Sequence, residues 1–372
     1  MKWKFYSLAF VAGMSILTAC SSDDNNDNDG NGGNGNGNEI ENGTILKGTI
    51  TSDVTLAAGN TYKLSGEYIV EEGATLHIEE GVKIIAVYDD IADYILVKQG
   101  GKINAVGTPD KPIVMTSEKE EPGAWGGIHI CGRAHTNAEG GKGSSEIGGA
   151  VYGGNDDADN SGTLQYIRLE YTGFAFDEEH EANGISFYGV GNGTIVDHCQ
   201  AYKGSDDGFE FFGGSVNVSN LVAVSCSDDS FDWTEGWNGK GTNLVAYQED
   251  KSTLGYDCDC LMECDNNGSN NAATPVAHPV LKNLILVGNG GSKQGIRLRA
   301  GTEVEIDNAK VCGKGQPLTV ETALTENALK NGTSKLTNIT LTSELSSKEG
   351  IYTHDDFIAV TSNKVDANLS YS

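Results

Sequence analysis

A short pattern, in which two apolar residues are separated by one other residue, recurs along this chain at intervals of 22 to 40 residues. Its first apolar position is taken in turn by Ile167, Cys199, Leu221, Leu244, Leu284, Ala309 and Ile339. A second alternating segment follows within most repeats and carries the pairs Ile185/Phe187, Phe209/Phe211, Phe231/Trp233, Cys258/Cys260 and Ile296/Leu298. Alternation with a period of two is typical of strands that bury one face. The repeat therefore predicts a chain built of successive, similar coils.

The spacing of the repeat indicates the architecture. Two or three short strands fill a repeat of 22 residues and leave no room for a helix between them. Strands of successive coils must then pair in parallel, and their inward residues stack into one core, as in a parallel β-helix. A β-propeller is the structural alternative, but each of its blades needs about 40 residues. We predict a single all-β solenoid domain over residues 44–372, with long loop insertions at 132–162 and 262–279 and one helix-like stretch at 323–331.

The N-terminus predicts export. Lys2 and Lys4 precede a short apolar segment, residues 5–17, which is too short to span a membrane and is typical of a signal peptide. The segment ends in Leu-Thr-Ala-Cys, which resembles a bacterial lipobox. We expect residues 1–19 to be removed and Cys20 to carry the lipid. A plain secretory signal with an incidental cysteine is the alternative.

A polar segment follows the predicted lipidation site. Residues 21–38 contain only Ser, Asp, Asn and Gly, and such a segment has no apolar surface to bury. We expect residues 20–43 to form a disordered tether. Acidic residues directly after the lipidated cysteine resemble the signal that sends some lipoproteins to the outer leaflet of the outer membrane. The sequence therefore predicts a cell-surface lipoprotein of the outer membrane, with a periplasm-facing lipoprotein as the alternative.

Charge and cysteine content narrow the function further. The chain has 53 acidic and 25 basic residues, a formal net charge of −28, which excludes a general nucleic-acid-binding protein because phosphate binding needs clustered Lys and Arg. No P-loop motif occurs, so no nucleotide partner is expected. Seven cysteines remain beyond Cys20, and an odd number in an exported protein predicts at least one free thiol or an intermolecular bridge.

Four segments carry a family resemblance. They are Trp125-Gly126-Gly127-Ile128, YGGNDDADNSGTLQYIRLEYTG, KGSDDGFEFFGG and SDDSFDWTEG. Together they resemble a family of exported bacterial right-handed β-helix proteins over roughly residues 45–320. The resemblance implies a right-handed parallel β-helix, whose coil architecture is more distantly similar to that of pectate lyases and polygalacturonase-type glycoside hydrolases. Most members of that family have no assigned activity, so the resemblance implies little about chemistry.

An acidic motif is repeated in register with the coils. Ser-Asp-Asp-Gly-Phe-Glu at 205–210 returns 22 residues later as Ser-Asp-Asp-Ser-Phe-Asp at 227–232. With the phenylalanines inward, we expect Glu210, Asp232, Asp259 and Arg297 to form an outward column on strands about 4.8 Å apart. Two carboxylates about 5 Å apart repel by roughly 3 kcal/mol at an effective dielectric constant of 20. A bound hard cation, a shared proton or the Arg297 guanidinium could offset this repulsion.

Oxygen-rich sites favour Ca²⁺ over zinc or copper. The candidate metal ligands are Asp206, Asp207, Glu210, Asp228, Asp229 and Asp232, and the candidate ligand-binding residues are Glu210, Asp232, Asp259, Arg297 and Arg299. An Asp between Ser and Gly is also a common turn residue, whose side chain hydrogen-bonds nearby backbone N–H groups. The aspartates of the motif are therefore explained either by a turn that they stabilise or by a cation site that they form.

Three functions are consistent with these features. The first is a non-catalytic surface lipoprotein that displays a Ca²⁺-bearing acidic strip for binding a glycan or another surface ligand. The second is a polysaccharide lyase or glycoside hydrolase that uses the same strip, with Asp207, Asp229 or Arg297 as acid or base candidates. The third is a purely structural or adhesion protein. The Gly-His-Gly motif of the polygalacturonase-type hydrolases is absent, so the sequence favours the first.

Overall fold

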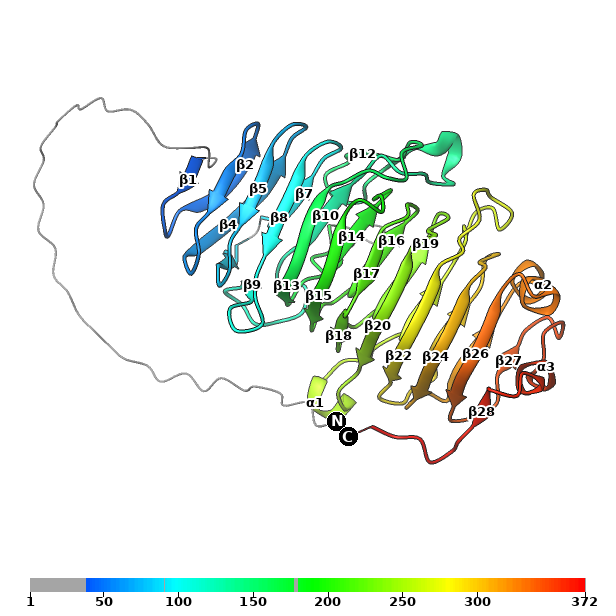
Figure 1. Cartoon of the computed structure of the whole chain (residues 1–372). Coiled ribbons are helices and arrows are strands. Elements are labelled where there is room, and N and C mark those ends of the chain that lie inside the picture. The colour runs from blue at the N-terminus through cyan, green and yellow to red at the C-terminus, as the bar shows by residue number, and fades with distance from the viewer. Residues whose placement is uncertain (1–37, 90, 177–179, 372) are drawn as a thin grey trace, which may run out of the picture. The chain divides into compact units, whose positions relative to one another are not determined.

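The computed structural model describes residues 38–371 except 90 and 177–179, and it is a stack of parallel β-strand coils (Figure 1). The predicted signal peptide, Cys20 and most of the predicted tether lie outside the described residues. The solenoid begins earlier than residue 44, because β1 (Asn38–Ile40) already pairs in parallel with β3 (Val54–Leu56). In the part of the chain that the structure describes, no helix is long and apolar enough to span a membrane.

The strands form three columns of parallel pairs, so the predicted all-β parallel β-helix is confirmed. Column 1 contains the second halves of β2 (Ile45–Ile50) and β4 (Thr61–Val70), followed by β7 (Tyr94–Val97), β10 (Ile128–Cys131), β14 (Ile185–Tyr188), β16 (Phe209–Phe212), β19 (Phe231–Thr234), β21 (Met262–Cys264), β23 (Gln294–Leu298), β25 (Gln316–Val320) and β27 (Ser346–Ser347). Column 1 carries the candidate site on its outward face.

Columns 2 and 3 are largely formed by the two halves of longer, bent strands. Column 2 contains β1, β3, β5 (Thr75–Ile78), β8 (Lys102–Val106), β17 (Asn217–Ser219) and the first halves of β13 (Gly162–Glu170), β15 (Ile195–Tyr202), β20 (Lys240–Tyr247), β22 (Val280–Val287), β24 (Glu305–Cys312) and β26 (Lys335–Leu341). Column 3 contains their second halves with the first halves of β2 (Ile45–Ile50) and β4, and with β6 (Lys83–Ala86), β9 (Ile113–Ser117), β18 (Val222–Val224) and β28 (Lys364–Val365).

Asparagine makes the bend between columns 2 and 3. Asn220, Asn243, Asn283, Asn308 and Asn338 have φ between 54° and 63°, a left-handed conformation that Asn tolerates better than most residues. The side-chain amides of successive coils also hydrogen-bond to one another, at 2.9 Å for each pair from Asn220 through Asn308. This geometry explains why Asn precedes the apolar pattern in many repeats.

The predicted register is confirmed along most of the solenoid. Ile167 pairs with Cys199, and Leu244, Leu284, Ala309 and Ile339 pair in succession. In column 1 the inward aromatic rings stack from coil to coil, with centroids 5.1 Å apart for Phe187 and Phe211 and 5.6 Å apart for Phe209 and Phe231. These rings are buried in one continuous core.

The predicted position of one strand is wrong. Cys258 and Cys260 are buried as expected, but they lie in the segment before the strand, which is Met262–Cys264. The insertion predicted at 262–279 therefore begins after this strand, and the short helix α1 (Lys251–Leu254) lies in the same long coil. All seven cysteines of the described region are free and buried.

The insertion at residues 132–162 packs over the outward face of column 1. It contains η1 (Glu139–Gly141) and a small antiparallel pair, β11 (Gly143–Ser144) and β12 (Val151–Tyr152). Its apolar residues form a second, smaller core with outward residues of the column: Leu96, Cys131, Ile147, Ala150, Tyr152, Tyr188 and Phe212. An outward face that would otherwise meet water is therefore buried on several coils.

The C-terminal coils carry two helices, α2 (Ala323–Asn331), as predicted, and α3 (His354–Ala359). Glu326 of α2 is fully buried and accepts hydrogen bonds from the backbone N–H groups of Glu349, Ile351 and Tyr352 and from the Ser347 hydroxyl, at 2.6–3.0 Å. Burial favours its neutral form, but the hydrogen bonds outweigh burial and hold the pKa of Glu326 below its usual value. This carboxylate fastens the loop before α3 to α2.

Replacing Glu326 by Ala should destabilise the C-terminal coils. The substitution leaves the buried N–H of Tyr352 without its acceptor, which costs about 1–3 kcal/mol. We expect Glu326→Ala to lower the free energy of unfolding by at least this amount and to speed hydrogen exchange in β26 and β28. The control is Glu344→Ala at an exposed glutamate, which should change stability by less than about 0.5 kcal/mol. Equal effects of the two variants would contradict the role of Glu326.

Candidate functional site

The outward residues of column 1 form an acidic row in register. Ser186 pairs with Glu210, Glu210 with Asp232, Asp232 with Glu263, and Glu263 with Arg297. The predicted neighbours Glu210 and Asp232 are thus confirmed, and Arg297 lies two strands beyond Asp232. We call this row from Glu210 to Arg297 the acidic column.

Asp259 does not belong to the acidic column, contrary to the prediction, and Glu263 takes its place. The distance in sequence from Asp232 to its partner Glu263 is 31 residues instead of 22. The additional residues form the corner segment that contains Asp259, whose N–H bonds to the carbonyl of Ser227 at 3.0 Å. Alternation starting from Phe231 therefore reaches the strand at Met262 and not at Cys258.

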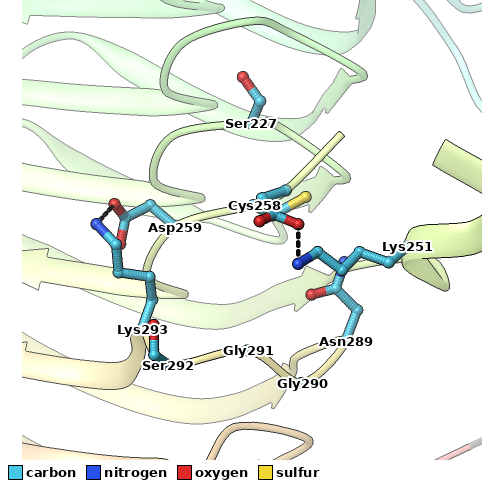
Figure 2. Close-up of a pocket in the computed structure, with 10 residues that line it drawn as sticks. Ser227, Lys251, Cys258, Asp259, Asn289, Gly290, Gly291, Ser292 and Lys293 are labelled. Carbon is cyan, nitrogen blue, oxygen red and sulfur yellow. Dashed lines mark hydrogen bonds and ion pairs between the residues drawn. The ribbon is translucent and has the colours of Figure 1, made fainter. Parts of the chain in front are cut away.

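Asp259 borders a pocket at the corner that leads into column 1, and this pocket has a volume of about 180 Å³ (Figure 2). Lys293 forms an ion pair with Asp259, and Lys251 forms one with Asp257. Because both lysines are paired with aspartates, the pocket offers no excess of positive charge. It contributes little attraction for an anionic ligand.

The second aspartate of each doublet hydrogen-bonds the backbone of the next coil. Asp207 Oδ1 accepts the N–H of Asp229 at 2.8 Å, and Asp229 Oδ1 accepts the N–H of Cys260 at 2.6 Å. Asn183 holds the equivalent place one coil earlier, since its Oδ1 accepts the N–H of Asp207 at 3.1 Å. One oxygen of Asp207 and one of Asp229 therefore serve the fold, but through hydrogen bonds between coils and not through the local turn bonds that the sequence left open. This use makes both residues less suited to proton transfer.

Carboxylate oxygens of the doublets and of the acidic column converge on places where a cation could bind. Oxygens of Asp207, Glu210 and Asp232 all lie within 4.8 Å of one another, and so do those of Asp229, Asp232 and Glu263. Asp206, Asp207 and Asp228 form a third such group at the corner. Asp232 is common to the first two groups, and its Oδ1 is buried without a hydrogen-bond partner among the described residues.

The acidic residues of β16 and β19 and of the corners before them have raised pKa values. Burial is the largest cause in each case, and neighbouring carboxylates add to it. The pKa rises to about 8 for Asp206 and to about 6 for the more exposed Asp228. The pKa values of Asp207, Glu210, Asp229 and Asp232 also lie well above the usual range. Burial, and to a lesser extent the crowding of carboxylates on this face, therefore destabilises the charged forms.

The two predicted arginines neutralise the far end of the acidic column. Arg297 contacts Glu263 at 2.9 Å and Glu321 at 3.2 Å. Arg299 contacts Glu263 at 2.9 Å and Asp265 at 2.7 Å. Each guanidinium is thus already shared between two carboxylates. The structure brings both arginines to the column, but it engages them in ion pairs.

Several acidic residues near the column come from segments that the repeat could not place. Glu146, in the insertion, accepts a hydrogen bond from the Tyr188 hydroxyl at 3.4 Å, and burial raises its pKa to about 7. Glu235 accepts hydrogen bonds from the hydroxyls of Tyr152 and Thr136 at 2.8 and 2.6 Å. The insertion has no periodicity, so no sequence signal could have assigned Glu146 to this face. Glu263 was recognisable from the alternation in Met-Glu-Cys.

The raised pKa values predict that stability without divalent cations increases as the pH falls from about 8 to about 5. In this range the folded protein binds protons at Asp206 and Asp228, whereas unfolded carboxyls, with pKa values near 4, bind almost none. Because the folded state binds more protons, the free energy of unfolding decreases as the pH rises. The measurement is the melting temperature in chelator across this range. Asp206→Asn should flatten the profile, whereas Asp110→Asn, at an exposed aspartate, should leave it unchanged.

Comparison with known proteins places the chain in a family. A family model described as a pectate-lyase-like beta helix domain matches residues 48–371. No curated protein and no solved structure matches the chain. The family match suggests a carbohydrate-related role, and the columns of parallel strands in the structure agree with the fold of this family. The chain belongs to the pectate-lyase-like β-helix domain family.

Proposed function

We propose that the protein is a surface lipoprotein of the outer membrane, anchored through Cys20, whose β-helix binds a glycan at the acidic column with the help of Ca²⁺. The observation that carries the proposal is the pair of carboxylates on β16 and β19, Glu210 and Asp232, which lie in register and form no ion pair with a guanidinium among the described residues. Asp232 adds a buried oxygen without a hydrogen-bond partner among the described residues. A bound cation would satisfy this oxygen and offset the repulsion.

The donor set fits Ca²⁺. This ion binds six to eight oxygen atoms at about 2.3–2.6 Å, so two oxygens on one ion lie at most about 5 Å apart. The oxygens of Asp207, Glu210 and Asp232, all within 4.8 Å of one another, meet this condition. Three carboxylates leave further coordination positions for water and for sugar hydroxyls. The ion would thus link the protein to the glycan, and the three carboxylates would fix the position of the ion.

The cellular location rests on the N-terminal sequence. The charged start, the short apolar segment and the Leu-Thr-Ala-Cys ending support removal of residues 1–19 and lipidation of Cys20. The Asp/Asn/Gly-rich segment that follows would keep the β-helix away from the membrane surface. Because the domain is negatively charged, anionic lipid would repel it, and such a spacer reduces this repulsion.

Glu146 supports an enzymatic alternative. A carboxyl group with a pKa of about 7 beside other carboxylates has the property that a glycosidase requires of its general acid. A hydrolase would therefore use Glu146 as the acid, in place of Asp207 and Asp229, which hold backbone N–H groups. A lyase is less well supported, because Arg297, its candidate base, is shared between two carboxylates.

Calcium should stabilise the protein through Asp232. A ligand that binds only the folded state at 100 times its Kd adds about 2.7 kcal/mol, which raises the melting temperature by several degrees. We expect Ca²⁺ to produce this shift, chelator to reverse it and Asp232→Asn to abolish it. Asp110→Asn serves as the control and should retain the shift. A melting temperature that does not respond to Ca²⁺ or chelator would refute the cation site.

Incubation with polysaccharides separates binding from catalysis. The proposed function predicts Ca²⁺-dependent retention of the protein on at least one polysaccharide without release of reducing ends or unsaturated products. Release of reducing ends without unsaturated products, lost in Glu146→Gln while Ca²⁺ still raises the melting temperature, would instead establish the hydrolase, and unsaturated products would establish the lyase.

A further inference from the structure

A second feature lies on the same edge of column 1 as the acidic doublets. It is a groove of about 680 Å³ beside the first column 1 strands, and its lining includes Lys47, Ser65, Glu67, Ile91, Tyr94 and Phe176. Ile91 is 56% exposed and Phe176 is 41% exposed, and the groove brings these two large apolar side chains together. Both present apolar surface to an incoming ligand.

The rings of the groove are held in place by aromatic contacts. Phe176 packs edge-on against Phe174 and against Tyr94, with ring centroids 5.2 and 5.9 Å apart. The Tyr94 hydroxyl donates a hydrogen bond to Glu67 at 3.0 Å. Ser65 and Lys47 add polar groups at the rim. An apolar ring surface with a few polar groups around it matches a sugar, which has an apolar C–H face and hydroxyls at its edge.

The register of the strands places the groove in line with the acidic column. Glu67 pairs with Tyr94, and β7, β10, β14 and β16 then follow one another in parallel. Three strand spacings of about 4.8 Å separate β7 from β16, or about 14 Å. A linear chain of several sugar units could therefore span the distance between the groove and the acidic column, passing outside the cover that buries the outward residues His129 and Ser186 between them.

Charge selects the kind of sugar. At the proposed cation site, Asp207, Glu210 and Asp232 together carry more negative charge than one Ca²⁺ can balance, and Asp206 and Asp228 lie beside them. Arg297 and Arg299 are already paired with carboxylates, and so is Lys293. At the acidic column a uronate would thus meet repulsion that these paired side chains do not compensate, and Lys47 at the groove lies several strands away.

We propose that the ligand is a neutral oligosaccharide, held by its hydroxyls at the acidic column and by the apolar face of another sugar unit on Ile91 and Phe176. This inference rests on the proposed function and names the substrate class. The groove then acts as a second subsite, and it contributes only to oligosaccharides long enough to reach it.

The test is calorimetric titration of the folded, Ca²⁺-loaded protein with neutral oligosaccharides, namely short and long fragments of β-glucan, mannan and galactan, and with oligogalacturonides of matched length. We expect long neutral fragments to bind more tightly than short ones. Phe176→Ala and Ile91→Ser should lower the affinity for the long fragments about threefold to tenfold and leave the affinity for the short ones unchanged. Ile195→Ser is the matched control, since Ile195 is 52% exposed and lies on column 2. Melting temperatures check that each variant is folded.

The outcomes separate this inference from the function on which it rests. One outcome is Ca²⁺-dependent binding that Asp232→Asn abolishes but that neither groove variant changes, whatever the length of the fragment. It would overturn the groove subsite and leave the proposed function standing. Tighter binding of oligogalacturonides than of neutral fragments would overturn the neutral substrate class. Failure of all the fragments to bind the Ca²⁺-loaded protein would overturn both. Loss of long-fragment affinity in the groove variants alone supports the inference.

Discussion

Parallel pairing in register is the constraint on which the rest of the structure depends. It places each residue about 4.8 Å from its equivalents in the coils before and after it. For apolar residues this closeness is favourable, because it stacks Phe209 on Phe231 in the core. It is also favourable for asparagine, whose amides donate and accept along the corner. For carboxylates the same spacing produces repulsion, so a repeated acidic motif requires a compensating interaction.

The structure compensates its acidic residues in three ways. Asp207 and Asp229 each direct an oxygen to a backbone N–H of the next coil. At the far end, guanidinium groups neutralise Glu263 and its neighbours. Between these regions, the one hydrogen bond to the Glu210 side chain from the described residues comes from the Asn183 amide, at 2.5 Å. Asp232 has a raised pKa and a buried Oδ1 without a partner among the same residues. The site is proposed at this position because the ordinary compensations end there.

Periodicity made most of the fold predictable. Residues at fixed coil positions, such as Leu284 and Ala309, could be assigned because the same apolar pattern returned at each coil. The prediction failed where a coil lengthened before its strand, and so Asp259 was placed where Glu263 lies. Glu146 could not be predicted, since a loop without a repeat gives no register. The site thus combines residues that the repeat determines with residues that only the tertiary fold brings to it.

The insertion at 132–162 explains why this face differs from the other two. It covers the outward side of column 1 with apolar residues and forms the second core around Tyr188 and Phe212. Glu210 lies two residues before Phe212 on the same strand, and so both side chains point to the same side of the sheet. Glu210 therefore lies at the boundary between that core and the solvent. Reduced contact with water weakens the solvation of a carboxylate and strengthens its attraction for a cation. A carboxylate row on an uncovered face would remain hydrated and bind a cation weakly, so the insertion and the acidic motif depend on each other for any function at this site.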